Sequence, residues 1–195
     1  GATLDNANRD SLNADYLIAR SNFSLNRLAA LGEVHFFRAS IEGFLYLNGA
    51  TLAAGKPEQL SLNLFQATVK GGILMGSDFS AENENRSFSA TGGVSLVEAT
   101  LGLIGAQAAT FTMPDGLALD CNGMSVVRVC SFDRINVSGG VSLARATVNG
   151  VLSFIDATLN NPKGDALNAM NLTAKSDVFL TRLVAAGSVN LYGAS

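Results

Sequence analysis

Residues 139–159 read GGVSLARATVNGVLSFIDATL, and the apolar side chains in this stretch repeat after eleven residues. Positions 0, 2, 5 and 7 of the first unit are Val141, Leu143, Ala146 and Val148, and those of the second are Leu152, Phe154, Ala157 and Leu159. Residues two apart face the same side of an extended segment, whereas a spacing of three requires a bend. An amphipathic helix needs apolar residues at i, i+3, i+4 and i+7, which this pattern lacks. Each unit is therefore predicted to be two very short strands joined by a bend.

The same frame covers nearly the whole chain. Position 0 is apolar in successive units, at Leu12, Phe23, Val34, Leu45, Leu62, Ile73, Val94, Ile104, Leu119, Cys130, Val141, Leu152, Leu167, Val178 and Val189. Two units close one coil, and stacked coils bury their apolar faces only against their neighbours. Parallel crossover connections are right-handed. The fold is predicted to be all-β, a right-handed parallel β-helix with about 22 residues per coil and roughly seven to eight coils.

Small residues and prolines mark the predicted corners. Position 9 is glycine or serine in eight units, Ser21, Gly32, Gly43, Gly71, Gly139, Gly150, Ser176 and Gly187. Glycine adopts positive φ without steric cost, which a tight corner demands. All three prolines lie in extended connections, 53–61, 112–118 and 160–166, that match residues 5–11. Because proline cannot donate to a strand ladder, these connections are predicted to leave the coil at one corner of every second coil.

The chain is predicted to be a single β-helix domain over 1–195, with an inserted polar loop near 76–87. Similar hexapeptides begin at residues 1, 49, 108 and 156, which indicates a longer repeat of 48 residues, or 59 where the loop is inserted. Both ends of the chain interrupt a unit, so we expect these residues to be a segment of a longer repeat array.

The motif Ala-x-Leu, as in Ala50-Thr51-Leu52 and Ala157-Thr158-Leu159, resembles that of pentapeptide-repeat proteins. The resemblance implies a right-handed quadrilateral β-helix with four five-residue sides per coil. The sequence departs from the family pattern in two ways. Its units run five plus six residues, and threonine replaces the usual Asp or Asn between alanine and leucine.

Composition excludes several partners. Charged residues make up 15% of the chain, compared with about 25% in ordinary domains. The net charge of −3 does not favour nucleic-acid binding. No run of 18 apolar residues occurs, so no membrane span is expected. The two cysteines fall on core positions and are predicted to be buried free thiols, which suits the cytoplasm or the exterior equally.

Hydroxyl side chains form the clearest predicted surface feature. Position 6 of alternate units points outward and carries Ser40, Thr68, Thr100, Ser125, Thr147 and Thr173. Such a column suits an ice-like or sugar-binding array, or it is ordinary decoration of strands by β-branched residues. The candidate interaction residues are Thr68, Thr100, Thr147 and Thr173, together with Asp78, Glu82 and Glu84 of the inserted loop.

No catalytic, cofactor or metal site is expected. His35 is the only histidine and is expected on the solvated surface, which argues against Ser-His-Asp and Cys-His arrangements. Asp120 with Asp133, or the acids of the inserted loop, are the carboxylates available for glycoside chemistry. Residues 4–13 contain four Asp or Asn side chains, but they lack the glycine and final glutamate of a calcium loop.

The pattern favours a non-enzymatic structural or interaction protein, a rigid β-helical rod that stacks end to end into a fibre or forms part of a longer cell-surface or scaffold protein. Its expected partner is protein, including a second copy of itself. Two alternatives stay open. One is a DNA-mimic inhibitor of a topoisomerase, a function known among pentapeptide-repeat proteins, and the other is a polysaccharide-binding or polysaccharide-cleaving β-helix.

Overall fold

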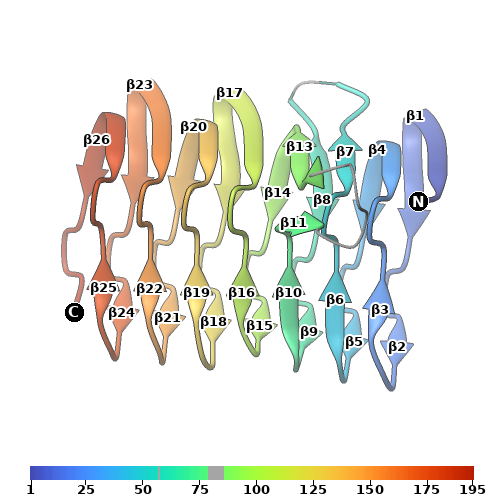
Figure 1. The fold of residues 1–195 in the computed structure, drawn as a ribbon, viewed down its shortest axis with the longest axis horizontal. Helices are drawn as coiled ribbons and strands as arrows, with labels where there is room; N and C mark the ends of the chain where they lie inside the picture. The colour runs from blue at the N-terminus through green and yellow to red at the C-terminus, as the bar shows by residue number, and fades with distance from the viewer. Residues whose placement is uncertain (57, 79–85) are drawn as a thin grey trace.

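The computed structural model describes residues 1–56, 58–78 and 86–195, which form three stacks of parallel strands along a rod (Figure 1). Sheet A contains β1 (Thr3–Asn13), β4 (Ala29–His35), β7 (Thr51–Ala53), β8 (Leu60–Asn63), β13 (Ser89–Thr91), β14 (Gly93–Ser95), β17 (Thr110–Asp120), β20 (Asn136–Ser142), β23 (Thr158–Asn168) and β26 (Val184–Asn190). Sheet B contains β2 (Ile18–Ala19), β5 (Ser40–Ile41), β9 (Thr68–Val69), β15 (Thr100–Leu101), β18 (Ser125–Val126), β21 (Thr147–Val148) and β24 (Thr173–Ala174). Sheet C contains β3 (Phe23–Ser24), β6 (Phe44–Tyr46), β10 (Gly72–Leu74), β16 (Ile104–Gly105), β19 (Cys130–Ser131), β22 (Leu152–Ser153) and β25 (Val178–Phe179).

The strands confirm the predicted right-handed, all-β solenoid of about seven turns. Strand partners repeat the eleven-residue frame, because Leu12 pairs with Val34 and Leu119 with Val141, one coil further along. Each coil is longer than 22 residues where a connection or insertion lies, and the spacing averages about 26 residues. The two ends of the chain lie at opposite ends of the rod (Figure 1).

The core follows the predicted inward positions. Leu47, Leu96 and Phe132 are fully buried in one continuous apolar cluster. Leu180 occupies the same position in the last coil, but 36% of it is exposed because no further coil covers it. The apolar frame therefore lines the inside of the rod.

The first bend of each unit relies on a conformation that the glycine pattern did not indicate. Position 4 has positive φ in every described unit except the one that leads into the inserted loop, where Ser77 occupies it. It is glycine in three units, and in the others it is Tyr16, Arg27, Arg38, Gln66, Glu98, Ala108, Arg134, Arg145, Asp156, Asn171 and Arg182. A hydrogen bond between backbone groups three residues apart closes each turn. For example, the N–H of Ala146 donates to the carbonyl of Leu143 at 3.0 Å. The turn geometry overrides the side chain's own preference at this position.

The glycines at position 9 serve two different purposes. Gly32, Gly139 and Gly187 have φ between 114° and 128°, as predicted. Gly43, Gly71 and Gly150 do not have positive φ, so the prediction is wrong for these three. At Gly150 a Cβ would instead overlap with the carbonyl oxygen of Arg128 in the preceding coil. Close approach of neighbouring backbones requires glycine there.

The extended connections form bulges in sheet A at one corner of every second coil. Strand register skips residues 6–9, 113–116 and 161–164, and we refer to these three segments as the bulges. Pro114 and Pro162 lie in the bulges, whereas Pro57 lies outside the described residues. Each bulge packs on a positive-φ glycine of the next coil, as the carbonyl oxygen of Met113 does on Gly139. Bulged and bulge-free coils therefore alternate along this part of the rod.

The inserted loop begins and ends in a short antiparallel pair, β11 (Ser77–Asp78) and β12 (Arg86–Ser87). Asp78 pairs with Arg86 through its backbone. Glu82 and Glu84 lie outside the described residues. In the part of the chain that the structure describes, no helix has the length and apolar character needed to cross a membrane.

Candidate functional site

The predicted hydroxyl column is a continuous ladder along sheet B. Strand register places its members directly above one another in the order Ile18, Ser40, Thr68, Thr100, Ser125, Thr147 and Thr173. The outward column two residues further on contains Glu42 and Lys70, which form an ion pair at 2.6 Å. A flat recognition face needs a second matched column. The column beside the ladder carries charged side chains instead, and the interaction role of Thr68, Thr100, Thr147 and Thr173 stays a prediction.

A second outward column builds the turns between sheets A and B. Its members stack in the order Asn13, His35, Asn63, Ser95, Asp120, Ser142, Asn168 and Asn190. The Oδ1 of Asn63 accepts the backbone N–H of Phe65 at 3.0 Å, and Asn168 accepts that of Met170 at 3.1 Å. Side chains of Asn and Asp favour this local bond in turns. The column therefore has a structural role.

The two carboxylates considered for glycoside chemistry are not brought together. Asp120 ends β17 in sheet A, and its Oδ1 accepts the N–H of Asn122 at 3.1 Å. Burial raises the pKa of Asp120, and the N–H of Asn122 lowers it in part. Asp133 follows β19 in sheet C and accepts the N–H of Ile155 at 2.9 Å. Both side chains stabilise turns at different corners of the coil.

We expect the substitution Asp120→Asn to stabilise the protein at neutral pH. The amide keeps the Oδ1 acceptor but removes a carboxylate whose pKa is raised by burial. A carboxyl group whose pKa is raised in the folded state destabilises that state only while it is ionised. The gain in stability should therefore vanish as the pH falls toward 3.8, the ordinary pKa of the group, because the carboxyl is then increasingly protonated. The gain should be less than about 1 kcal/mol because the side chain is only half-buried and water screens its charge.

Urea denaturation at pH 7 and near pH 4 measures this difference. Asp120→Ala is the control, because it removes both the charge and the acceptor of the turn, and we expect it to destabilise the protein by about 1 kcal/mol at pH 7. A gain from Asp120→Asn that is equal at both pH values would contradict the assignment of the carboxylate's charge as its cause.

His35 and the cysteines lie in structural surroundings. The Nε2 of His35 is 3.3 Å from Oδ1 of Asp10 and 3.2 Å from Oε1 of Glu33. Burial raises the pKa of Glu33, although His35 opposes this shift. Cys121 and Cys130 are buried free thiols, as predicted, and burial raises the pKa of both.

Of the acids and amides of residues 4–13, Asn6 stabilises the first bulge itself, since its Nδ2 donates to the carbonyl of Asp10 at 3.1 Å, and the carboxylate of Asp10 lies beside His35. Among the described residues no group of three or more His, Cys, Asp or Glu side chains has an arrangement that could hold a metal.

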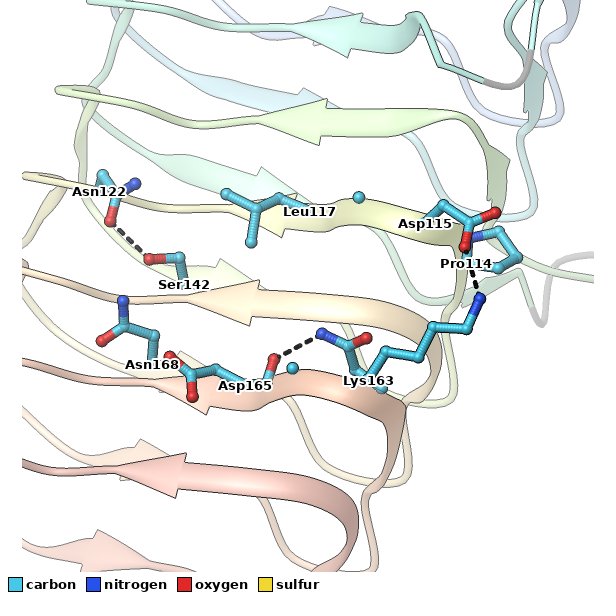
Figure 2. A pocket seen from close by; sticks show the side chains of 11 residues that line it. Pro114, Asp115, Leu117, Asn122, Ser142, Lys163, Asp165 and Asn168 are labelled. Atoms are coloured by element: carbon cyan, nitrogen blue, oxygen red, sulfur yellow. Dashed lines mark hydrogen bonds and ion pairs between the residues drawn. The ribbon is translucent and has the colours of Figure 1, made fainter.

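A groove of about 490 Å³ lies between the bulges 113–116 and 161–164, beside β20 (Figure 2). It is lined by Pro114, Asp115, Gly116, Leu117, Asn122, Ser142, Asn161, Lys163, Gly164, Asp165 and Asn168. The Nζ of Lys163 reaches across to Oδ1 of Asp115 at 3.3 Å, and both side chains are highly exposed. The groove exists because β20, between β17 and β23, has no bulge of its own.

Two amide groups present fixed donors to this groove. Oδ1 of Asn122 accepts a hydrogen bond from Oγ of Ser142 at 2.6 Å, and Oδ1 of Asn168 is held by Met170. Each bond orients its amide, and each Nδ2 is left without an acceptor among the described residues. Asn122 is not needed by its turn, because Val97 occupies the same position of another coil.

Two side chains of the second bulge present fixed acceptors. Nδ2 of Asn161 donates to the carbonyl of Asp165 at 2.9 Å, which leaves its Oδ1 as an acceptor. Oδ1 of Asp165 accepts from Oγ of Ser188, which leaves Oδ2. Sequence reasoning missed this groove, because its walls come from segments 48 residues apart. The only signal in the sequence was the recurrence of the proline-containing connections.

Stacked parallel coils with one continuous apolar core define the chain as a right-handed parallel β-solenoid. Comparison with protein families, with curated proteins and with solved structures finds no match to this chain. The geometry of its surfaces and ends is therefore the basis for assigning a function.

Proposed function

We propose that the protein is a non-enzymatic structural or interaction protein, a rigid β-helical rod that associates end to end or forms part of a longer cell-surface or scaffold protein. The observation that carries this proposal is the apolar face of the last described coil, which a further coil, of the same chain or of a second copy, would cover. The inward positions Val178, Leu180, Val189 and Leu191 are 36–49% exposed. Their equivalents one coil earlier, Leu152, Phe154, Leu167 and Ala169, are at most 2% exposed. Burial of such side chains is worth roughly 25 cal/mol per Å².

The first coil of a second copy has the matching shape. It presents partly buried apolar side chains at the same inward positions, including Leu12, Leu17 and Phe23. The outer strands at both ends, β2 and β3 at one and β24 and β25 at the other, each pair on one side only. Unpaired strand edges act as templates for pairing with another chain. The first coil of a second copy would therefore cover the apolar face and, at the same time, pair with the unpaired strand edges of the last coil.

The absence of catalysis is part of this proposal. The side chains of Asp120 and Asp133 are each committed to a backbone N–H of a turn, which supports a structural role for both. The proposal also places the chain among pentapeptide-repeat-like solenoids, on the basis of its short strands and of a bend with positive φ in each unit. Its units of five plus six residues distinguish it from the regular family pattern.

Charge placed on the last coil tests the association. We expect the protein to form concentration-dependent oligomers, and Val178→Lys and Val189→Lys to return it to a monomer, because a buried unpaired ammonium costs several kcal/mol. Thr147→Lys is the control, since Thr147 lies on the outward ladder of sheet B in a middle coil. Sedimentation velocity over a range of concentrations measures the outcome. A wild-type protein that stays monomeric, or oligomers that persist in both lysine variants, would overturn end-to-end association.

A further inference from the structure

We infer that the groove between the bulges 113–116 and 161–164 binds a neutral, hydroxyl-rich ligand, namely a short stretch of a carbohydrate chain. This site is separate from the ends of the rod, so it does not depend on end-to-end association. Its volume of about 490 Å³ falls within the range of roughly 300–1,000 Å³ seen for ligand sites.

The arrangement of donors and acceptors favours hydroxyl groups. The groove offers two oriented donors, the Nδ2 atoms of Asn122 and Asn168, and two oriented acceptors on Asn161 and Asp165. In each of these four side chains the second polar atom already takes part in a hydrogen bond within the protein, which fixes the side chain. Little conformational entropy is therefore lost when a ligand binds. A hydroxyl both donates and accepts, so adjacent sugar hydroxyls satisfy both kinds of group. The side chain of Leu117, which is 40% exposed, offers an apolar contact for the C–H face of a sugar.

Other ligand classes fit less well. An anion would meet two carboxylates, Asp115 and Asp165, against the single ammonium of Lys163. The two amide donors do not suit a cation, which binds oxygen ligands. A peptide strand would need an unpaired strand edge, and β20 is paired with β17 on one side and β23 on the other. The ion pair across the groove is no obstacle, because exposed pairs contribute only about 0–1 kcal/mol.

Two substitutions remove the donors while keeping the turns. Asn122→Val places at this position the residue that another coil has as Val97. Asn168→Ser places there the residue found as Ser95 and Ser142 in the same outward column. Asn63→Ser is the matched control, because it makes the same change in the same column but away from the groove.

The probes are cellotetraose, mannotetraose and xylotetraose, with an uncharged Ser/Thr-rich peptide for comparison. We expect at least one tetrasaccharide to bind the full chain saturably and to shift the side-chain amide signals of Asn122 and Asn168 in ¹H–¹⁵N spectra. Asn122→Val and Asn168→Ser should each weaken binding at least tenfold, the loss expected from about 1.4 kcal/mol, and Asn63→Ser should bind like the wild type. Circular dichroism verifies that each variant is folded.

The inference is overturned if none of the three tetrasaccharides binds saturably, if only the peptide binds, or if both groove variants bind as tightly as the wild type. Oligomeric state is measured separately for the same samples. A monomeric protein that still binds sugar would therefore refute end-to-end association and leave the carbohydrate-binding proposal standing.

Discussion

Phe132→Ala should lower the free energy of unfolding by about 3–5 kcal/mol, the usual cost of emptying a core site of this size. Phe132 is fully buried, and its ring lies 5.0 Å from that of Phe154 in the next coil, measured between centroids. A solenoid coil packs only on its two neighbours, so few side chains can move in to fill the cavity. The loss should therefore lie near the upper end of this range.

Urea denaturation followed by far-ultraviolet circular dichroism measures the effect. Phe179→Ala is the control, because Phe179 points outward in the last coil and is 41% exposed. We expect it to cost about 1 kcal/mol or less. Equal losses in the two variants would mean that position 132 does not lie in a packed core.

Gly139→Ala should be the second severe substitution, with a loss of about 3 kcal/mol or more. Gly139 has a φ of 123°, a region that is strained for any residue with a Cβ. The added Cβ would also overlap with the carbonyl oxygen of Met113 in the bulge of the preceding coil. Because the obstacle is backbone, relief requires the bulge to move.

Gly123→Ala separates these two causes. Its φ of 65° lies in the left-handed region, but its Cβ would make only an ordinary contact, at 3.5 Å from Cγ of Glu98. We expect a loss of about 1 kcal/mol from the backbone conformation alone. Chemical denaturation of both variants gives the comparison, and a Gly139→Ala loss no larger than that of Gly123→Ala would contradict the close packing of the bulge.

The inside of the rod could be predicted from sequence because burial acts on every unit in the same way. Leu47, Leu96 and Phe132 follow the spacing of apolar residues and are all buried. The left-handed bends could not be predicted, since residues such as Glu98 and Arg145 occupy them without any local preference for that conformation. There the stacking of coils on both sides determines the backbone, and the side chain simply points to solvent.

The groove shows a different limit. Asn122 and Asn168 belong to outward positions that elsewhere only shape turns, so nothing in their local sequence marks them as unusual. Their Nδ2 atoms become available at one site only because two bulges enclose the coil between them. The threonine column attracted attention in the sequence because it is periodic, yet periodicity is what strand stacking alone produces.

The packing of each bulge on a glycine of the following coil has a consequence for how such a rod can change its length. Loss of a bulge-free coil, or gain of a bulged one, would bring two bulges into adjacent layers, where each would occupy the space that Gly139 or Gly187 now leaves open. Duplication of a pair of coils keeps this packing intact, and each such step extends the rod by about 10 Å, twice the separation of neighbouring strands.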